Sequence, residues 1–236
     1  MRRIVQPGLP VPERIQWVAA AGRAFSFTLE AGLPLIEAAR RGFAAEGFAG
    51  GTLNIKGGAL GPFAFVMPAL SSTGENAAFY SETFRPPGVT RLRMGTMTFG
   101  QRDGAPFFHC HALWREAGGR AGGGHILPEE AVLAEPFVVE AFGIDGAIFT
   151  AELDPETNFK LFGPVPSAPV PGQPAAPSRC GCGRTRILRA RWKRSAVNNG
   201  SRVQKSMAAS AASSARALRM AALSNPLRLK WLSVRV

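Results

Sequence analysis

Hydrophobic and polar residues alternate along much of the first two thirds of the chain. From residue 23 onward, Phe25, Phe27 and Leu29 alternate with small or charged residues. Because successive side chains of a strand point to opposite faces, this period of two indicates half-buried strands. Similar short runs, separated by glycine and proline, occupy residues 52–56, 62–69, 77–84, 89–99, 106–114, 132–142 and 147–153. The pattern predicts about eight strands at short spacing.

Only residues 34–46 of this region have a helical pattern. An apolar stripe at i, i+4 spacing is formed by Leu35, Ala39 and Phe43. Glu37 and Arg41 have the spacing of an exposed ion pair on the same helix. One helix among many short strands predicts the α+β class, with a largely antiparallel sheet in one compact domain.

The chain divides into four parts by composition. Residues 1–22 contain several prolines and are predicted to be an extended leader. Residues 23–163 carry the strand and helix patterns and form the predicted domain. Residues 164–178 are rich in proline, which is typical of a stiff linker. Residues 179–236 form a basic tail rich in Arg, Ala and Ser, which we expect to be disordered in isolation.

Charge is distributed very unevenly. The whole chain has 28 basic and 16 acidic residues, for a formal net charge of +12. Residues 1–165 contain all 16 acidic residues and 14 basic ones, a net charge of −2, so the remaining 14 basic residues lie in residues 166–236. The predicted domain is therefore close to neutral, and the basic excess belongs to the tail.

Other sequence features limit the location of the protein. Residues 1–7 contain no apolar run typical of a secretory signal, and no stretch of about 18 apolar residues is present. Cys110, Cys180 and Cys182 are too few for a disulfide framework. These features predict a cytoplasmic protein without a membrane partner.

The three histidines of the chain, His109, His111 and His125, lie within one short window. On a strand, His109 and His111 project from one face and Cys110 projects from the other. The glycine-containing segment 116–119 is a natural turn, and a hairpin centred on residue 118 places His125 directly opposite His111.

Three converging imidazoles are the ligand set of an open zinc site, with one position left for water or another ligand. The sequence therefore predicts a metal site at His109, His111 and His125. The alternative is that these histidines are ordinary strand residues without a ligand. Glu75, Glu82 and Glu116 are the acidic candidates for a general acid or base, and no feature of the sequence selects among them.

The segment 104–111, Gly-Ala-Pro-Phe-Phe-His-Cys-His, followed by 122–126, Gly-Gly-Gly-His-Ile, resembles the signature of the plants-and-prokaryotes-conserved (PPC) domain. The early strand, the helix, the Gly-Ala-Leu turn at 58–60 and the segment 154–157 occur in the order of that family. The resemblance covers about residues 23–163. It implies a compact α+β domain of the prokaryotic stand-alone type, assembly as a homotrimer, and zinc at the three histidine positions.

The resemblance also implies a link to DNA and a regulatory role, because plant members carry AT-hook segments ahead of the PPC domain. This chain departs from that pattern, since it has no Arg-Gly-Arg-Pro core. The near-neutral body also lacks the basic face of a DNA-binding domain.

The tail has several interpretations. Arginine interleaved with tryptophan can bind nucleic acid through phosphate contacts and base stacking. The candidate residues are Arg184, Arg186, Arg189, Arg191, Lys193 and Arg194. The tail could instead bind an acidic membrane surface, remain a solvated segment without a specific partner, or be the product of a shifted reading frame.

A cupin-like metal-dependent enzyme is the alternative for the domain. His109, His111 and Glu116 have the order of the first cupin motif, but the residues around His125 do not fit the second. The early helix also fits poorly in a β-barrel. The sequence specifies neither a reaction nor a small-molecule ligand.

Overall fold

The computed structural model of the chain describes residues 5–169 and 178–183. Strands dominate, and they occur in the order β1 (Ile15–Leu29), β2 (Gly51–Ile55), β3 (Ala59–Leu60), β4 (Phe65–Val66), β5 (Pro68–Leu70), β6 (Ala78–Tyr80), β7 (Thr90–Arg102), β8 (Ala105–Arg115), β9 (Ala121–Ile126), β10 (Phe137–Asp145), β11 (Ala147–Asp154), β12 (Phe159–Pro166) and β13 (Ser178–Gly183). The α-helix α1 (Leu35–Ala45) follows β1, and a short 3-10 helix spans Pro128–Glu130.

Eleven of these strands form one sheet, with the order β13-β1-β10-β2-β7-β8-β9-β4 along its main path. β3 and β11 pair with β7, and β12 extends the sheet by pairing with β11. All of these pairs are antiparallel except β11 with β7. The predicted α+β class, with a largely antiparallel sheet and one main helix, is therefore confirmed.

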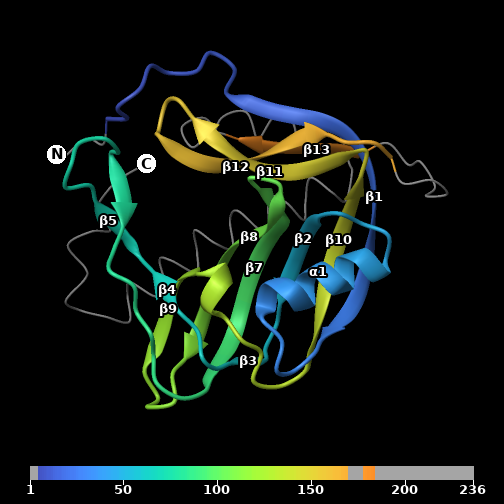
Figure 1. Cartoon of the computed structure of the whole chain (residues 1–236), viewed down its shortest axis with the longest axis vertical. Coiled ribbons are helices and arrows are strands. Elements are labelled where there is room, and N and C mark those ends of the chain that lie inside the picture. Colours follow the sequence, from blue (N-terminus) through green and yellow to red (C-terminus); the bar gives the residue numbers. More distant parts are fainter. Residues whose placement is uncertain (1–4, 170–177, 184–236) are drawn as a thin grey trace, which may run out of the picture.

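Helix α1 covers one face of the sheet in front of β1, β2 and β10 (Figure 1). The predicted stripe is buried in the structure, and Phe43 stacks on Phe99 of β7 with ring centroids 5.2 Å apart. The predicted ion pair is also present, since Arg41 Nε lies 2.7 Å from Glu37 Oε1. Gly47 follows the helix with a φ of 79°, a left-handed conformation that glycine adopts without strain.

The main core lies between α1 and the sheet. Its largest fully buried side chains include Phe43, Phe108 and Trp114. Cys110 belongs to the same core with 0% exposure, and burial raises the pKa of its thiol to about 12. Cys110 therefore faces away from its two histidine neighbours, as the strand alternation predicts. Its thiol remains neutral because it is buried.

The first strand begins at Ile15, within the segment that the sequence assigns to the leader. β1 is long because it pairs with two partners in succession, β13 over Ile15–Ala20 and β10 over Ala21–Leu29. The backbone of β13 falls where the sequence predicts the linker to end and the tail to begin. No local pattern in residues 178–183 indicates this pairing, since they include two glycines and an arginine.

Residues 5–14 lie against the turn between β11 and β12. Gly8 N donates a hydrogen bond of 3.0 Å to Glu156 O, and Val11 N donates one of 3.1 Å to Glu156 Oε2. Arg14 forms an ion pair with the same carboxylate, which is only 10% exposed. The leader is thus held by one buried acidic residue.

Strand β12 is absent from the predicted elements and extends the folded region to Pro166. Its prolines argue against a strand in the sequence pattern, because proline has no N–H to donate to the hydrogen bonds between strands. Among the described strands β12 pairs with β11 alone and so lies at an edge, where Pro164 and Pro166 can be accommodated.

Within the described residues, no helix is long and apolar enough to cross a membrane. The tail residues Arg184, Arg186, Arg189, Arg191, Lys193 and Arg194 lie outside the described residues.

Candidate metal centre

The hairpin formed by β8 and β9 brings the three histidines together. His111 of β8 pairs directly with His125 of β9, which confirms the register predicted from the sequence. The turn closes through a 2.8 Å hydrogen bond from Glu116 N to Arg120 O, and Gly119 adopts a φ of 83°. His109 lies two residues before His111, on the same face of β8.

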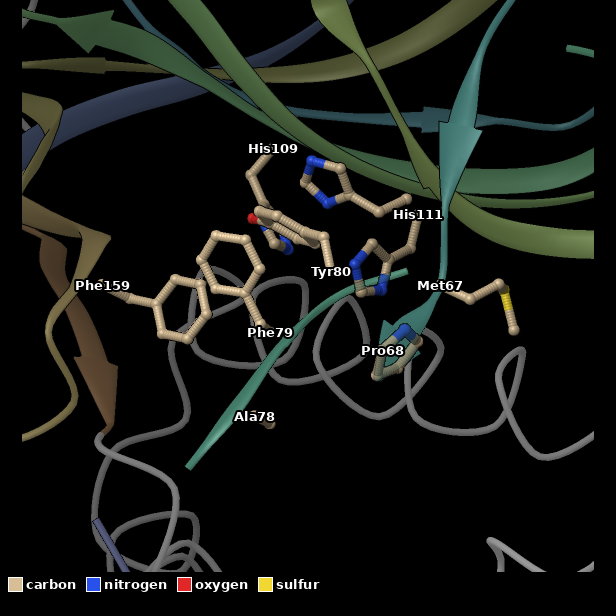
Figure 2. A pocket seen from close by; sticks show the side chains of 9 residues that line it. Met67, Pro68, Ala78, Phe79, Tyr80, His109, His111 and Phe159 are labelled. Carbon is tan, nitrogen blue, oxygen red and sulfur yellow. The ribbon is translucent and has the colours of Figure 1, made fainter. Parts of the chain in front are cut away.

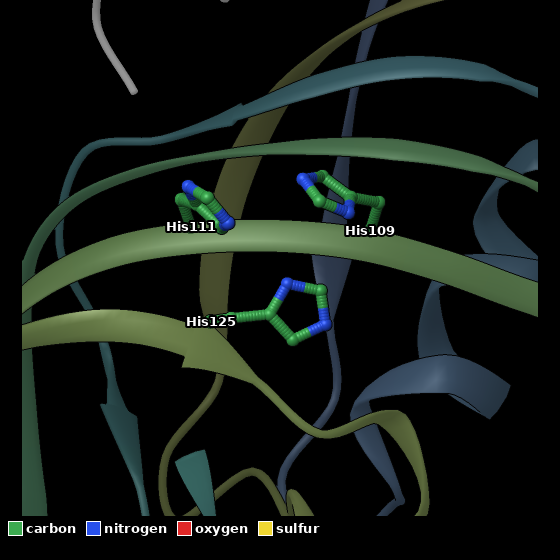
Figure 3. A group of neighbouring side chains, drawn as sticks. All are labelled: His109, His111 and His125. Atoms are coloured by element: carbon green, nitrogen blue, oxygen red, sulfur yellow. The ribbon is translucent and has the colours of Figure 1, made fainter. Parts of the chain in front are cut away.

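The imidazoles converge on the sheet face opposite α1 (Figure 3). Their ring centroids are 4.7 Å apart for His109–His111, 4.7 Å for His109–His125 and 5.3 Å for His111–His125. One ligand nitrogen from each residue lies within 4.8 Å of the other two. This group of three side chains, called the histidine cluster below, has the composition of an open zinc site.

The glycines before His125 allow its strand to approach the core closely. A Cβ atom at Gly122 would lie 2.4 Å from Trp114 Nε1, and one at Gly124 would lie 2.9 Å from the ring of Phe65 and from Val66 O. Because β9 has no side chains at these positions, it fits between β8 and β4. His125 then lies between His111 and Val66, its partners in the two neighbouring strands.

Burial and mutual repulsion keep the imidazoles neutral. Removal from water lowers the pKa of His111 to about 4, and the pKa of His125 is lowered to about 4 by burial and then by the charge of His111. Although part of His109 is open to the pocket, desolvation and its two neighbours lower its pKa well below 6.5. Neutral imidazole is the form that binds a metal, so at neutral pH no proton must leave the cluster first.

One atom of the cluster lacks the partner that a buried polar group normally has. His111 Nδ1 is buried, and it has no hydrogen-bond partner among the residues that the structure describes. An unsatisfied buried polar atom costs about 1–3 kcal/mol, so such atoms are rare in native proteins. A metal ion bound at the cluster is one way to satisfy it. The donor set, three imidazoles, fits zinc.

A pocket of about 220 Å³ opens over the histidine cluster (Figure 2). One wall is the small β5–β6 sheet, which follows β4 directly, and the other wall includes Phe159 of β12. Besides the histidines, the pocket is lined by Met67, Pro68, Ala78, Phe79, Tyr80 and Phe159. The sequence analysis did not identify these wall residues.

The three aromatic rings of the wall contact one another and the cluster. Phe79 and Phe159 stack with centroids 5.6 Å apart, and Tyr80 meets Phe159 edge-on at 5.9 Å. The ring of Tyr80 also lies 5.6 Å from that of His125. Figure 2 shows these rings beside His109 and His111. The walls of the pocket are therefore almost entirely apolar and aromatic.

Two asparagines fix the β5–β6 sheet relative to β12. Asn76 Nδ2 donates hydrogen bonds to the main-chain oxygens of Thr157 (3.1 Å) and Asn158 (3.2 Å). Asn158 Nδ2 donates in return to Glu75 O at 2.8 Å. Because Phe159 follows Asn158 and Phe79 lies on β6, this pair of side chains sets the width of the pocket.

No acidic residue of the described part of the chain lines the pocket. Glu116 is instead paired with Arg120 in the β8–β9 turn, with Arg120 Nη2 2.9 Å from Glu116 Oε1. Neither Glu75 nor Glu82 is a lining residue. Glu116, the acidic ligand that a cupin motif requires, is therefore not part of the cluster that the described residues form.

The fold and the histidine cluster define an α+β domain with three imidazoles gathered on one face of a largely antiparallel sheet. Solved structures similar to this chain include a plant- and prokaryote-conserved (PPC) protein from Pyrococcus horikoshii, with 21% identity, a TM-score of 0.46, and coverage of 61% of this chain and 94% of that one. They also include a metal-containing protein from Archaeoglobus fulgidus (17% identity, TM-score 0.45, coverage 60% and 94%). A third is a candidate DNA-binding protein from Ralstonia eutropha (14% identity, TM-score 0.43, coverage 58% and 89%). A PPC protein is thus among the structural neighbours, as the resemblance in the sequence predicts.

No protein-family model and no curated protein matches the sequence.

Proposed function

We propose that this chain is a metal-binding protein that holds one zinc ion at the histidine cluster. The observation that carries the proposal is the convergence of three neutral imidazoles, with ligand nitrogens within 4.8 Å of one another, around an open position. The unpartnered His111 Nδ1 supports it, because a buried nitrogen in this cluster needs a partner. His109, His111 and His125 would hold the ion, and the ion would supply a Lewis-acidic centre at the pocket floor.

The test is the zinc stoichiometry of the full chain. Protein purified without chelators, stripped of metal and titrated with zinc should bind one ion per chain and unfold at a higher temperature, because zinc binds the folded state. Measurement by elemental analysis and by thermal unfolding distinguishes this site from weak surface binding. Substoichiometric zinc without a change in the unfolding temperature would contradict the proposal.

Homotrimeric assembly and DNA binding complete the proposal. Trimer formation is supported by the resemblance to the PPC domain, and it predicts a particle of three chains in light scattering.

DNA is proposed as a partner of the tail, because residues 166–236 carry 14 basic residues and no acidic one, whereas residues 1–165 have a net charge of −2.

Deletion of the residues after 183, which keeps β13 in the sheet, should therefore remove most of the DNA affinity and its steep salt dependence, since both come from phosphate contacts by basic side chains. Fluorescence anisotropy with a labelled duplex at several salt concentrations measures both quantities. A shortened chain that binds DNA with the salt dependence of the full chain would place the contacts in the domain instead.

A further inference from the structure

The pocket over the histidine cluster has a polar floor and apolar walls. Its floor consists of three imidazoles, and its walls include the rings of Phe79, Tyr80 and Phe159 (Figure 2). Among the described residues that form the walls, Tyr80 alone carries a polar side-chain group, its hydroxyl. A ligand in this pocket therefore needs one metal-binding group at one end and an apolar body at the other.

The charge of the centre indicates the kind of metal-binding group. This step rests on the proposed function, namely zinc at the cluster. Three neutral imidazoles leave the two positive charges of the ion in place, and no acidic side chain of the described residues lines the pocket to balance them. Because an uncompensated charge in apolar surroundings is unfavourable, the open position favours an anion.

The same lining favours a single negative charge over two. A carboxylate places one oxygen on the metal and leaves one oxygen that the Tyr80 hydroxyl can satisfy. A phosphate would bring further charged oxygens into a pocket whose described wall residues offer no other side-chain donor. Each unpaired anionic oxygen would lose its hydration without compensation.

The size and the walls of the pocket indicate the apolar body. A protein cavity of about 150 Å³ holds a benzene molecule, so a pocket of about 220 Å³ has room for one six-membered ring and a small acidic group. Aromatic rings prefer offset-stacked or edge-to-face neighbours, and the walls already show both arrangements. Phe79 stacks on Phe159, and Tyr80 meets Phe159 edge-on.

We propose that this pocket binds a small aromatic carboxylate, with the carboxylate on the metal and the ring among Phe79, Tyr80 and Phe159. Such a ligand neutralises part of the charge of the ion and buries its own ring against the three side chains. The pair Asn76 and Asn158 positions these walls, so the pocket exists before the ligand enters.

The test compares benzoate with acetate on the zinc-loaded full chain by titration calorimetry. The two probes share the carboxylate and differ in the ring, so benzoate should bind at least about 10-fold more tightly. Phe159→Ala should remove most of this difference, because it takes away one of the three rings of the wall. The matched control is Phe107→Ala, because Phe107 stacks on Phe162 and is not a pocket residue.

Different failures have different meanings in this experiment. Equal affinities for benzoate and acetate in a chain that binds one zinc ion would overturn the ligand assignment alone. Tighter binding of inorganic phosphate than of benzoate would overturn it as well. A chain that takes up no zinc at the cluster would overturn the proposed function, and the ligand assignment with it.

Discussion

Replacement of His125 by alanine is expected to lower the zinc affinity of the full chain by more than about 100-fold. Loss of an outer-shell partner of a metal ligand typically costs about 10–100-fold in affinity, and loss of a ligand itself costs more. His125 is 8% exposed and lies opposite His111 on the neighbouring strand, so its replacement removes one of the three ligand nitrogens of the cluster. Competition with a chromophoric chelator measures the change.

The same loss is expected for His109→Ala and His111→Ala, because each contributes one nitrogen to the cluster. Cys110→Ala is the matched control. Cysteine is also a common metal ligand and Cys110 lies on the same strand as His109 and His111, but its side chain is buried in the core on the other face of β8. Loss of zinc in Cys110→Ala with zinc retained in His125→Ala would show that the ligands are assigned to the wrong face of β8.

Replacement of Phe43 by alanine is expected to destabilise the fold by about 3–5 kcal/mol, the usual cost of removing a large buried aromatic ring. Phe43 has no exposed surface. It stacks on Phe99 and makes edge-on contacts with Phe25 and Phe27, at centroid distances of 5.6 and 5.9 Å. Its ring therefore joins α1 to the sheet, and denaturant unfolding of the zinc-free chain should show the loss.

Phe79→Ala is the control for this change, because it removes the same ring from a residue that is 48% exposed. We expect a cost of about 1 kcal/mol or less there, since most surface substitutions have small effects on stability. A similar loss of stability in both variants would contradict the placement of the core between α1 and the sheet.

The convergence of the three histidines could be predicted from the sequence because its geometry is local. His109 and His111 share a strand face by alternation, and a short turn between residues 116 and 119 determines the partner of His111. The same local rules predict the opposite orientation of Cys110. The helix could be predicted for the same reason, since its stripe and its i, i+4 ion pair lie within three turns.

The walls of the pocket could not be predicted because they depend on long-range packing. Tyr80 and Phe159 are far apart in the chain, and the hydrogen bonds of Asn76 and Asn158 join the segments that bring them into contact. The aromatic run around Tyr80 predicts a strand, but it does not indicate which surface that strand covers. The pairing of β1 with β13 has the same origin, since neither strand carries a signal for its partner.

The most direct test of the proposed zinc site is an anomalous difference map at the zinc absorption edge from crystals of the full chain grown with zinc. We expect a single peak at the histidine cluster, with one nitrogen of each of His109, His111 and His125 about 2.0–2.1 Å away. A map in which the zinc-bound protein has no peak between these three side chains, or has its peak at other residues, would contradict the assignment.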